Sequence, residues 1–378
     1  MTAVTHPSPE TNLPRYFRLR WVVGFVAVLI VPLIMLWFWS TGSPWVFVAL
    51  PLIIYGAFPI ADLFLGRDSA NLTEAQEQAV EKDPYFKALL YLTLPIYAFS
   101  IYLVLISTGM MLPQADGSGL HWGWLVLLMV GTGLYHGTVI NVAHELGHSG
   151  KKLDKRTAKL ANALVGYGHF SLEHNAGHHR RVATPEDCAS ARLGESFYAF
   201  ALREVPGAVW GAIELERQRL KKRGFWHPSN QLLQIWLLSV VLMLPLVVVF
   251  GPWMIPLIAL HHLVSWLMLS QANYVEHYGL GRGRTAHGHY EPVRPIHSWN
   301  ANQWFSNALL FNLQRHSDHH AHAWRDYQVL RTFDDVPTLP SGYPGSFVLA
   351  LIPPLWFRAM DHRVKAWADK HGGTINRG

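Results

Sequence analysis

Residues 125–148 read LVLLMVGTGLYHGTVINVAHELGH, an apolar run without Lys or Arg that ends on two histidines. A helix needs about 20 apolar residues to cross the roughly 30 Å hydrocarbon core of a bilayer. The run therefore predicts a membrane span that ends near residue 143. His144 and His148 follow it four residues apart, so both project from one face of a helix.

Five further stretches are also long, apolar and free of Lys and Arg. The expected spans lie near residues 21–40, 45–65, 88–112, 121–143, 231–250 and 252–272. Half of the 378 residues are hydrophobic and only 15% are charged, which favours a membrane protein over a soluble one. No small-residue cleavage site follows the first span, so we interpret it as a retained helix rather than a signal peptide.

The distribution of Lys and Arg predicts the orientation of the chain. None of the 31 Lys and Arg residues falls in the connections 41–44, 113–120 or 251–252, whereas the other side holds all of them. Cytoplasmic loops carry the cationic excess, so we expect both termini in the cytoplasm. Of the 25 acidic residues only Asp116 lies outside, so the formal charge inside is 31 − 24 = +7, which suits anionic lipids and acidic partners.

The resulting fold class is an all-α integral membrane protein with six transmembrane helices and a cytoplasmic helical cap. We expect a single domain over residues 1–378, with the cap formed by residues 144–230 and 273–378. Within the cap, residues 214–223 mix Glu with Arg and Lys at helical spacing, which predicts either a helix at the membrane surface or a solvated charged helix. The lone cysteine, Cys188, excludes an internal disulfide and a cysteine-ligated iron centre, so any electrons must come from another protein.

Histidines cluster on the predicted cytoplasmic side. Of 22 histidines, nine candidate ligands fall in four groups, HELGH at 144–148, EHNAGHH at 173–179, NYVEHYGL at 273–280 and LQRHSDHHAHA at 313–323, the last of which also contains His322. The nine are His144, His148, His174, His178, His179, His277, His316, His319 and His320. Neutral imidazole binds iron, zinc, copper or nickel, and nine ligands exceed what one ion accepts. Two ions would each receive four or five ligands and keep a position open, so the count favours a dinuclear site.

Each group alone has a simpler explanation, because a His pair four residues apart is common on helix surfaces. Three such groups, together with a fourth group that contributes His277, lie on one membrane face, so chance is a poor explanation for the whole set. His322 is either a surface residue or a support for a ligand. His136, His261 and His262 lie within spans, where polar side chains usually face the protein interior. They either line a reaction cavity or bond a neighbouring helix, and for His261 we favour the bond.

Carboxylates accompany the histidine groups. Metal-bound imidazoles are normally oriented by a carboxylate or carbonyl that accepts the other ring N–H. The candidates for this role are Glu145, Glu173, Asp187, Glu276 and Asp318. Ordinary salt bridges to Arg180, Arg181 or Arg315 are the alternative for some of them.

The motifs resemble those of a known family. HELGH, EHNAGHH and LQRHSDHH are similar to the three histidine boxes of the membrane non-haem di-iron oxygenases and desaturases. NYVEHYGL resembles the additional His element of the alkane 1-monooxygenase branch, and the resemblance covers nearly the whole chain. It implies that the nine histidines bind two iron ions (Fe²⁺/Fe³⁺), with O2 as co-substrate. It also implies terminal hydroxylation of n-alkanes to 1-alkanols in a bacterial inner membrane, with electrons from a separate rubredoxin and its reductase.

An alkane has no polar handle, so its binding must come from apolar burial, worth about 0.8 kcal/mol per methylene. A bundle of membrane helices supplies such a slot. Candidate lining residues are Trp37, Trp39, Tyr55, Phe58, Thr132, Leu134 and Leu263. Each alone is equally compatible with a lipid-facing or packing role.

Three other functions fit parts of the pattern. A related desaturase or hydroxylase acting on fatty acids or xylene-like aromatics would share the boxes. HELGH also fits the HExxH signature of zinc proteases, but that site needs one further ligand rather than seven. A metal transporter usually places its ionisable ligands near the bilayer midplane, whereas these groups sit at one face.

Overall fold

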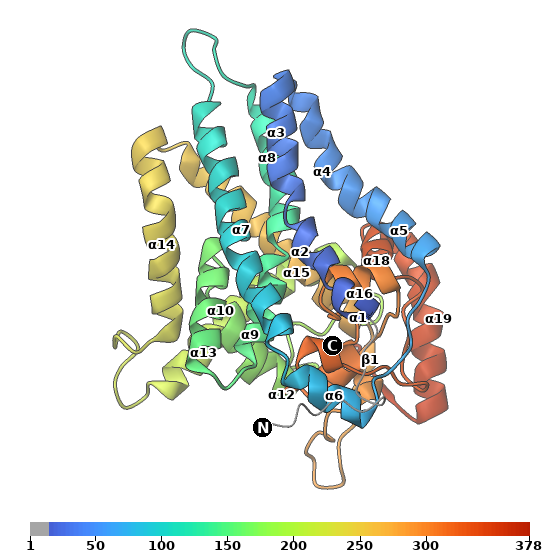
Figure 1. Ribbon diagram of the computed structural model, residues 1–378. Helices are drawn as coiled ribbons and strands as arrows, with labels where there is room; N and C mark the ends of the chain where they lie inside the picture. Colours follow the sequence, from blue (N-terminus) through green and yellow to red (C-terminus); the bar gives the residue numbers. More distant parts are fainter. Residues whose placement is uncertain (1–14) are drawn as a thin grey trace, which may run out of the picture.

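The computed structural model describes residues 15–378 and is built almost entirely of helices. Figure 1 shows upright helices forming one half of the molecule, with short helices and loops packed against one end of them. Five helices are long and apolar enough to cross a membrane, Pro44–Leu65, Pro84–Met110, Trp122–Gly147, Gln231–Phe250 and Met254–His277. The two parts of the first predicted span, Phe17–Ala27 and Ile30–Thr41, meet at 43°. The described chain thus has five spans, or six if this bent pair counts as one.

The spans depart from the predicted boundaries at two places that matter for the site. The helix α15 (Met254–His277) runs past the predicted end at 272 and carries His277 itself. The fourth span consists of α8 (Trp122–His136) and α9 (Val139–Gly147), separated at Gly137 and Thr138. Hydropathy ends a span at the first polar residues, whereas these helices continue because their polar turns are buried in protein.

The helices α8 and α15 lie in close contact because glycines line their interface. A Cβ atom added to Gly133 would lie 2.8 Å from the backbone oxygen of His261, and one added to Gly137 would lie 2.7 Å from that of Ser265. Small residues permit this approach of backbones in membrane bundles. The contact fixes the helix that leads to His144 against the helix that ends on His277.

The remaining helices surround the histidine groups. Along the chain, α9 is followed by α10 (Lys152–Leu164), α11 (Phe170–Glu173) and α12 (His179–Arg181). The helix α13 (Phe197–Arg219) ends before Lys221, so the predicted charged helix over 214–223 is only partly helical. After α14 (Gln231–Phe250) and α15 come α16 (Trp304–Leu309), α17 (His316–Ala321), α18 (Tyr343–Ala350) and α19 (Pro353–His371). The two-residue strands β1 (Leu280–Gly281) and β2 (Thr374–Ile375) pair antiparallel.

The N-terminal half contributes the other wall of the bundle. It contains α1 (Arg15–Leu19), α2 (Val22–Ala27), α3 (Ile30–Thr41), α4 (Ala49–Leu52), α5 (Phe58–Leu65), α6 (Glu74–Glu81) and α7 (Pro84–Met110). Short 3₁₀ turns occur at Pro44–Val48, Pro295–His297 and Tyr327–Val329. Two π-helical turns occur at Ile53–Ala57 and His174–His178, and such turns are frequent at functional sites.

Candidate metal centre

The nine predicted histidines come together as two adjacent groups. His144, His148, His174, His179 and His319 form the first, which we call the open cluster because His148 and His179 are only partly buried. His178, His277, His316 and His320 form the second, which we call the buried cluster because all four are buried. In each group one nitrogen from every ring lies within 4.8 Å of the others.

Two segments divide their histidines between the clusters. In the π-helical turn His174–His178 and the following residue, His174 and His179 join the open cluster, whereas His178 joins the buried one. In α17, His316 and His320 lie one turn apart in the buried cluster, and His319 faces the open cluster. The end of α9 contributes only to the open cluster and the end of α15 only to the buried one. The two clusters are therefore built on shared elements and hold each other in place.

The ring nitrogens converge at distances suited to metal ligands. In the open cluster the Nε2 atoms of His144 and His319 are 2.9 Å apart, and those of His174 and His179 are 3.0 Å apart. In the buried cluster the Nε2 of His316 lies 2.9 Å from the Nε2 of His320 and 3.2 Å from the Nε2 of His277. Neighbouring ligands bound at about 2.1 Å in a six-coordinate site would lie about 3.0 Å apart.

Hydrogen bonding alone does not account for this convergence. A neutral imidazole carries one N–H, and the Nε2 of His319 faces both His144 and His179. The Nε2 of His148 is buried with no hydrogen-bond partner among the described residues. Buried polar atoms without partners are costly, and a cation in the centre of each cluster would satisfy them. The residues present therefore fit two metal ions.

Burial also keeps the imidazoles in the form that binds metals. Burial lowers the pKa of His148 to about 4 and holds the pKa values of His174 and His319 well below the usual value. Neutral rings expose a lone pair to a cation. His178 is the exception, because the Asp187 carboxylate outweighs the effect of burial and raises its pKa.

Two of the predicted carboxylates contact the buried cluster. The Nδ1 of His178 lies 2.8 Å from an oxygen of Asp187, which also accepts a hydrogen bond from Ser190 at 2.6 Å. An oxygen of Glu276 lies 3.2 Å from the Nε2 of His316, and its other oxygen accepts a 2.7 Å bond from Tyr343. Nothing in the sequence pattern indicated Ser190 or Tyr343, because hydroxyls distant in sequence from a histidine group carry no spacing signal.

The other three carboxylates bond elsewhere. Glu145 accepts a hydrogen bond from the backbone N–H of Tyr327 at 2.9 Å. Glu173 pairs with Arg181 at 2.6 Å, which is the salt bridge considered as its alternative. Asp318 lies 2.7 Å from the Nδ1 of His322, so His322 is connected to the ligand helix through this carboxylate. Among residues 15–378, no carboxylate forms an ion pair with a histidine of the open cluster.

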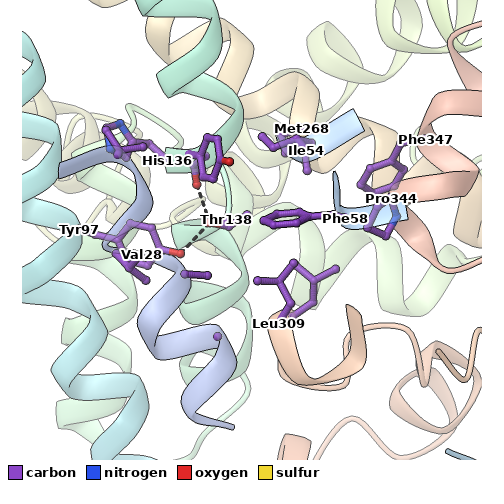
Figure 2. Close-up of a pocket in the computed structure, with 15 residues that line it drawn as sticks. Val28, Ile54, Phe58, Tyr97, His136, Thr138, Met268, Leu309, Pro344 and Phe347 are labelled. Carbon is purple, nitrogen blue, oxygen red and sulfur yellow. Dashed lines mark hydrogen bonds between the residues drawn. The ribbon is translucent and has the colours of Figure 1, made fainter. Parts of the chain in front are cut away.

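A narrow apolar cavity of about 40 Å³ lies within the spans. Figure 2 shows Phe58 between Met268 and Leu309, with Tyr97 hydrogen-bonded to Thr138. A smaller space of about 30 Å³ shares Thr138, Met268, Leu310 and Phe347 with it. This second space also touches Asn141 and Leu313, each three residues before a cluster histidine. The two cavities therefore share part of their lining, and the second one reaches residues close in sequence to a histidine of each cluster.

The lining differs from most of the predicted candidates. Of the seven, Phe58 lines the cavity, whereas Tyr55, Thr132 and Leu134 do not. Trp37, Trp39 and Leu263 are 51%, 48% and 44% exposed and lie on the outer surface of the bundle. Apolar residues face both lipid and interior in a membrane helix, so hydropathy alone does not separate the two faces. Residues of α2, of α3, of the link between them and of the 309–310 turn line the cavity instead, including Val28, Val31 and Leu310.

The intramembrane histidines form a hydrogen-bonded chain. The Nδ1 of His136 lies 2.8 Å from the Nε2 of His261, and its Nε2 lies 2.8 Å from the hydroxyl of Ser100. The Nδ1 of His261 lies 3.2 Å from the Nδ1 of His262. His261 thus bonds a neighbouring helix as expected, and His136 both forms that bond and lines the cavity.

Comparison with known proteins is consistent with this site. Residues 120–358 match the family model described as "Fatty acid desaturase". The chain is 44% identical over 350 residues to "Alkane 1-monooxygenase" of Ectopseudomonas oleovorans, covering 92% of this chain and 84% of that protein. It is 46% identical over 350 residues to "Alkane 1-monooxygenase 1" of Alcanivorax borkumensis, with the same coverage. A more distant relative, "Xylene/toluene monooxygenase hydroxylase component XylM" of Pseudomonas putida, is 28% identical over 61% of this chain.

Proposed function

The chain belongs to the alkane 1-monooxygenases, within the fatty acid desaturase family, and we propose that its open and buried clusters each hold one iron ion. Its activity is alkane hydroxylation. In the terminal reaction, R–CH3 + O2 + 2 e⁻ + 2 H⁺ gives R–CH2OH + H2O, so one oxygen atom enters the C–H bond and the other leaves as water. The observation that carries the proposal of two metal ions is the convergence of nine imidazoles into groups of five and four.

Iron fits the chemistry of the donors and of the reaction. Imidazole is a good ligand for iron, zinc and copper, and a metal ion that activates O2 must change its oxidation state, which zinc does not do. When bound, iron supplies the activation of dioxygen. The protein contributes nine histidine ligands, the orientation of His178 by Asp187 and a site from which bulk water is largely excluded by burial.

We propose that the two apolar cavities together form a path for the alkane, and that this path determines which carbon reacts. Its walls offer an alkane dispersion contacts but no charged group, and Val31, Ile54 and Leu310 are all buried there. An n-alkane dissolved in the bilayer would thread its chain through this path and present its methyl end first. Asn141 and Leu313 lie where the path approaches the histidines. We propose that this geometry gives terminal selectivity.

The proposed electron donor is a separate rubredoxin, itself reduced by a rubredoxin reductase. Two electrons are needed per turnover, and the single cysteine of the chain cannot build a cysteine-ligated iron centre. Cys188 is also packed against Gly207. A separate carrier must therefore bring the electrons to a surface near the clusters.

We propose that the histidine clusters face the cytoplasm and that the protein lies in a bacterial inner membrane. The support is the absence of Lys and Arg from the connections 41–44, 113–120 and 251–252. The clusters lie at the opposite ends of the spans from these connections. A reduced cytoplasmic carrier would then reach them without crossing the bilayer.

The second candidate function is hydroxylation of an aromatic methyl group, because the chain is similar to a xylene and toluene monooxygenase component. A fatty acid hydroxylase or desaturase is the other alternative. The test is product identification by the purified protein with iron, rubredoxin and reductase. The substrates are octane, hexadecane, xylene and a fatty acid. We expect 1-octanol or 1-hexadecanol as the main product. Predominant aromatic methyl oxidation, or alkene formation, would contradict the proposal.

A further inference from the structure

A basic segment follows His148, a residue of the open cluster, directly in the sequence. Residues 149–156 read SGKKLDKR, and Lys151, Lys152, Lys155 and Arg156 are all exposed. Leu153, in the middle of the segment, is 62% exposed. Four exposed cations, none of which forms an ion pair within residues 15–378, surround one exposed apolar side chain, as in the rim and centre of a transient protein interface.

The one carboxylate in this segment does not offset the cations at the surface. Asp154 is fully buried and pairs with Lys87 at 2.8 Å. It also accepts a hydrogen bond from Tyr91. Its charge is therefore turned inward and neutralised by α7, which leaves the outward surface of the segment positive.

A cleft of about 500 Å³ lies beside the basic segment. Lys151 and Leu153 line it on one side, and it also touches Glu145 and Leu146, which follow the ligand His144 in sequence. Glu81, Lys82 and Asp326 line it from α6 and from the loop after α17. Asp83, which also lines the cleft, is paired with Arg18. The cleft itself is lined by five carboxylates and three lysines, so the positive surface is confined to the basic segment at its edge.

The open cluster is also the more accessible of the two. His148 and His179 are partly exposed and their rings lie 4.7 Å apart, whereas every histidine of the buried cluster is covered. Lys151 is three residues from His148, so their Cα atoms lie at most about 11 Å apart. Electron transfer between proteins weakens steeply with distance, which favours a docking site at this short range.

We propose that the exposed basic segment 149–156, at the edge of the cleft, forms the docking site of a small acidic one-electron carrier. The inference rests on the proposed function, because it assigns the surface through which that reaction receives its electrons. Two carriers dock in turn, each is oxidised by one electron, and the centre gains the two electrons that monooxygenation consumes. The cations attract the carrier by charge complementarity, and Leu153 contributes an apolar contact at the centre.

The test compares two sets of charge reversals in the full-length, iron-loaded protein in nanodiscs. The first variant is Lys151→Glu with Lys152→Glu and Lys155→Glu. The matched control is Lys221→Glu with Lys222→Glu and Arg223→Glu, three exposed cations that follow α13. The probes are an acidic rubredoxin for turnover and the same rubredoxin with zinc in place of iron for binding.

The first variant should raise both the KM for rubredoxin and the Kd of the zinc form by about tenfold, and it should reduce the salt dependence of binding. Its metal content and its kcat at saturating carrier should match the unmodified protein, as should all properties of the control. A milder set, Lys151→Ala with Lys152→Ala, should move the same two constants in the same direction. This set keeps the test valid if the charge reversal fails to fold.

Equal KM and Kd values for the first variant and the unmodified protein would overturn the docking site while leaving the proposed function intact. A defect that follows the charge of the nanodisc lipid rather than the carrier concentration would overturn it too, because lipid headgroups would then be the ligand. If the unmodified protein binds the carrier yet makes no alkanol, the proposed function fails instead. The binding readout separates these outcomes.

Discussion

The open and buried clusters share their ligand type but differ in their surroundings. The open cluster has five histidines, two of them partly exposed, and no carboxylate ion pair within residues 15–378. The buried cluster has four covered histidines, with Asp187 on His178 and Glu276 beside His316. Exposure suits exchange with a partner in solution, whereas burial with charged partners suits a rigid ligand set. The difference predicts that the two proposed metal positions have unequal roles, which the first three predictions below test.

The largest effect is expected from removing a ligand of the smaller cluster. His316→Ala leaves three histidines in the buried cluster, whereas His148→Ala leaves four in the open one. Loss of an orienting partner alone costs about 10–100-fold in metal affinity or activity, so His316→Ala should cost more than about 100-fold. Bound iron should fall toward one ion per chain for His316→Ala and less for His148→Ala. Metal analysis and alkanol assays on both variants check this, and equal losses would remove the proposed asymmetry.

A smaller effect is expected from the carboxylate that orients a buried ligand. Asp187→Asn keeps the shape of the side chain but removes the charge that faces the Nδ1 of His178. Activity should fall by about 10–100-fold with the fold retained. Asp335→Asn is the control, because Asp335 is exposed and pairs only with Lys370 and His371 among the described residues. If Asp187→Asn behaves like this control, the carboxylates do not distinguish the clusters.

Chelation should separate the clusters kinetically. A hydrophilic iron chelator reaches a partly exposed site more readily than a covered one, so iron should leave in two phases of similar amplitude. The faster phase should come from the open cluster, and His148→Ala should accelerate it while leaving the slower phase unchanged. Stopped-flow absorbance of the chelate follows both phases. Release in a single phase would show that exposure of His148 and His179 does not control access.

The smallest effect on rate is expected on the substrate side, where neither cluster should change. Val31→Phe adds bulk to a buried residue that lines the cavity, and overpacking of this kind costs about 1–3 kcal/mol. The longest alkanes should lose turnover while octane is affected least, and iron content should stay constant. Leu33→Phe is the control, because Leu33 is 61% exposed on the same helix. A change in iron binding, or an unchanged chain-length preference, would contradict the proposal that this cavity holds the alkane chain.

The sequence was sufficient to predict the membrane helices and the nine histidines that converge. Spacing placed His144 and His148 on one helical face, and their rings lie 5.0 Å apart. It did not predict that the neighbours His178 and His179 belong to different clusters, because this depends on a π-helical turn that has no clear sequence signature. Of the five predicted carboxylates, Asp187 and Glu276 contact the buried cluster. Glu145 and Glu173 bond elsewhere, so nearness in sequence to a histidine did not separate the two kinds.

The cavity was the least predictable feature. Its lining comes from α2, α3, α5, α7, α8, α15, α16 and α18 and from links between helices, and which face of each helix points inward depends on tertiary packing. Trp37 and Trp39 are exposed, yet in the sequence they are as apolar as a residue that lines a cavity, so hydropathy did not distinguish them. The bend between Phe17–Ala27 and Ile30–Thr41 was also not indicated by hydropathy, since both halves are apolar.

The most direct test of the account is metal analysis coupled to product identification on one purified sample, with octane, isotope-labelled dioxygen, rubredoxin and reductase. The account predicts about two iron ions per chain, in keeping with the two groups of imidazole ligands, and 1-octanol that carries one labelled oxygen atom. A fully active sample that holds a single iron ion per chain, or zinc in its place, would contradict it. So would a product whose oxygen comes from water.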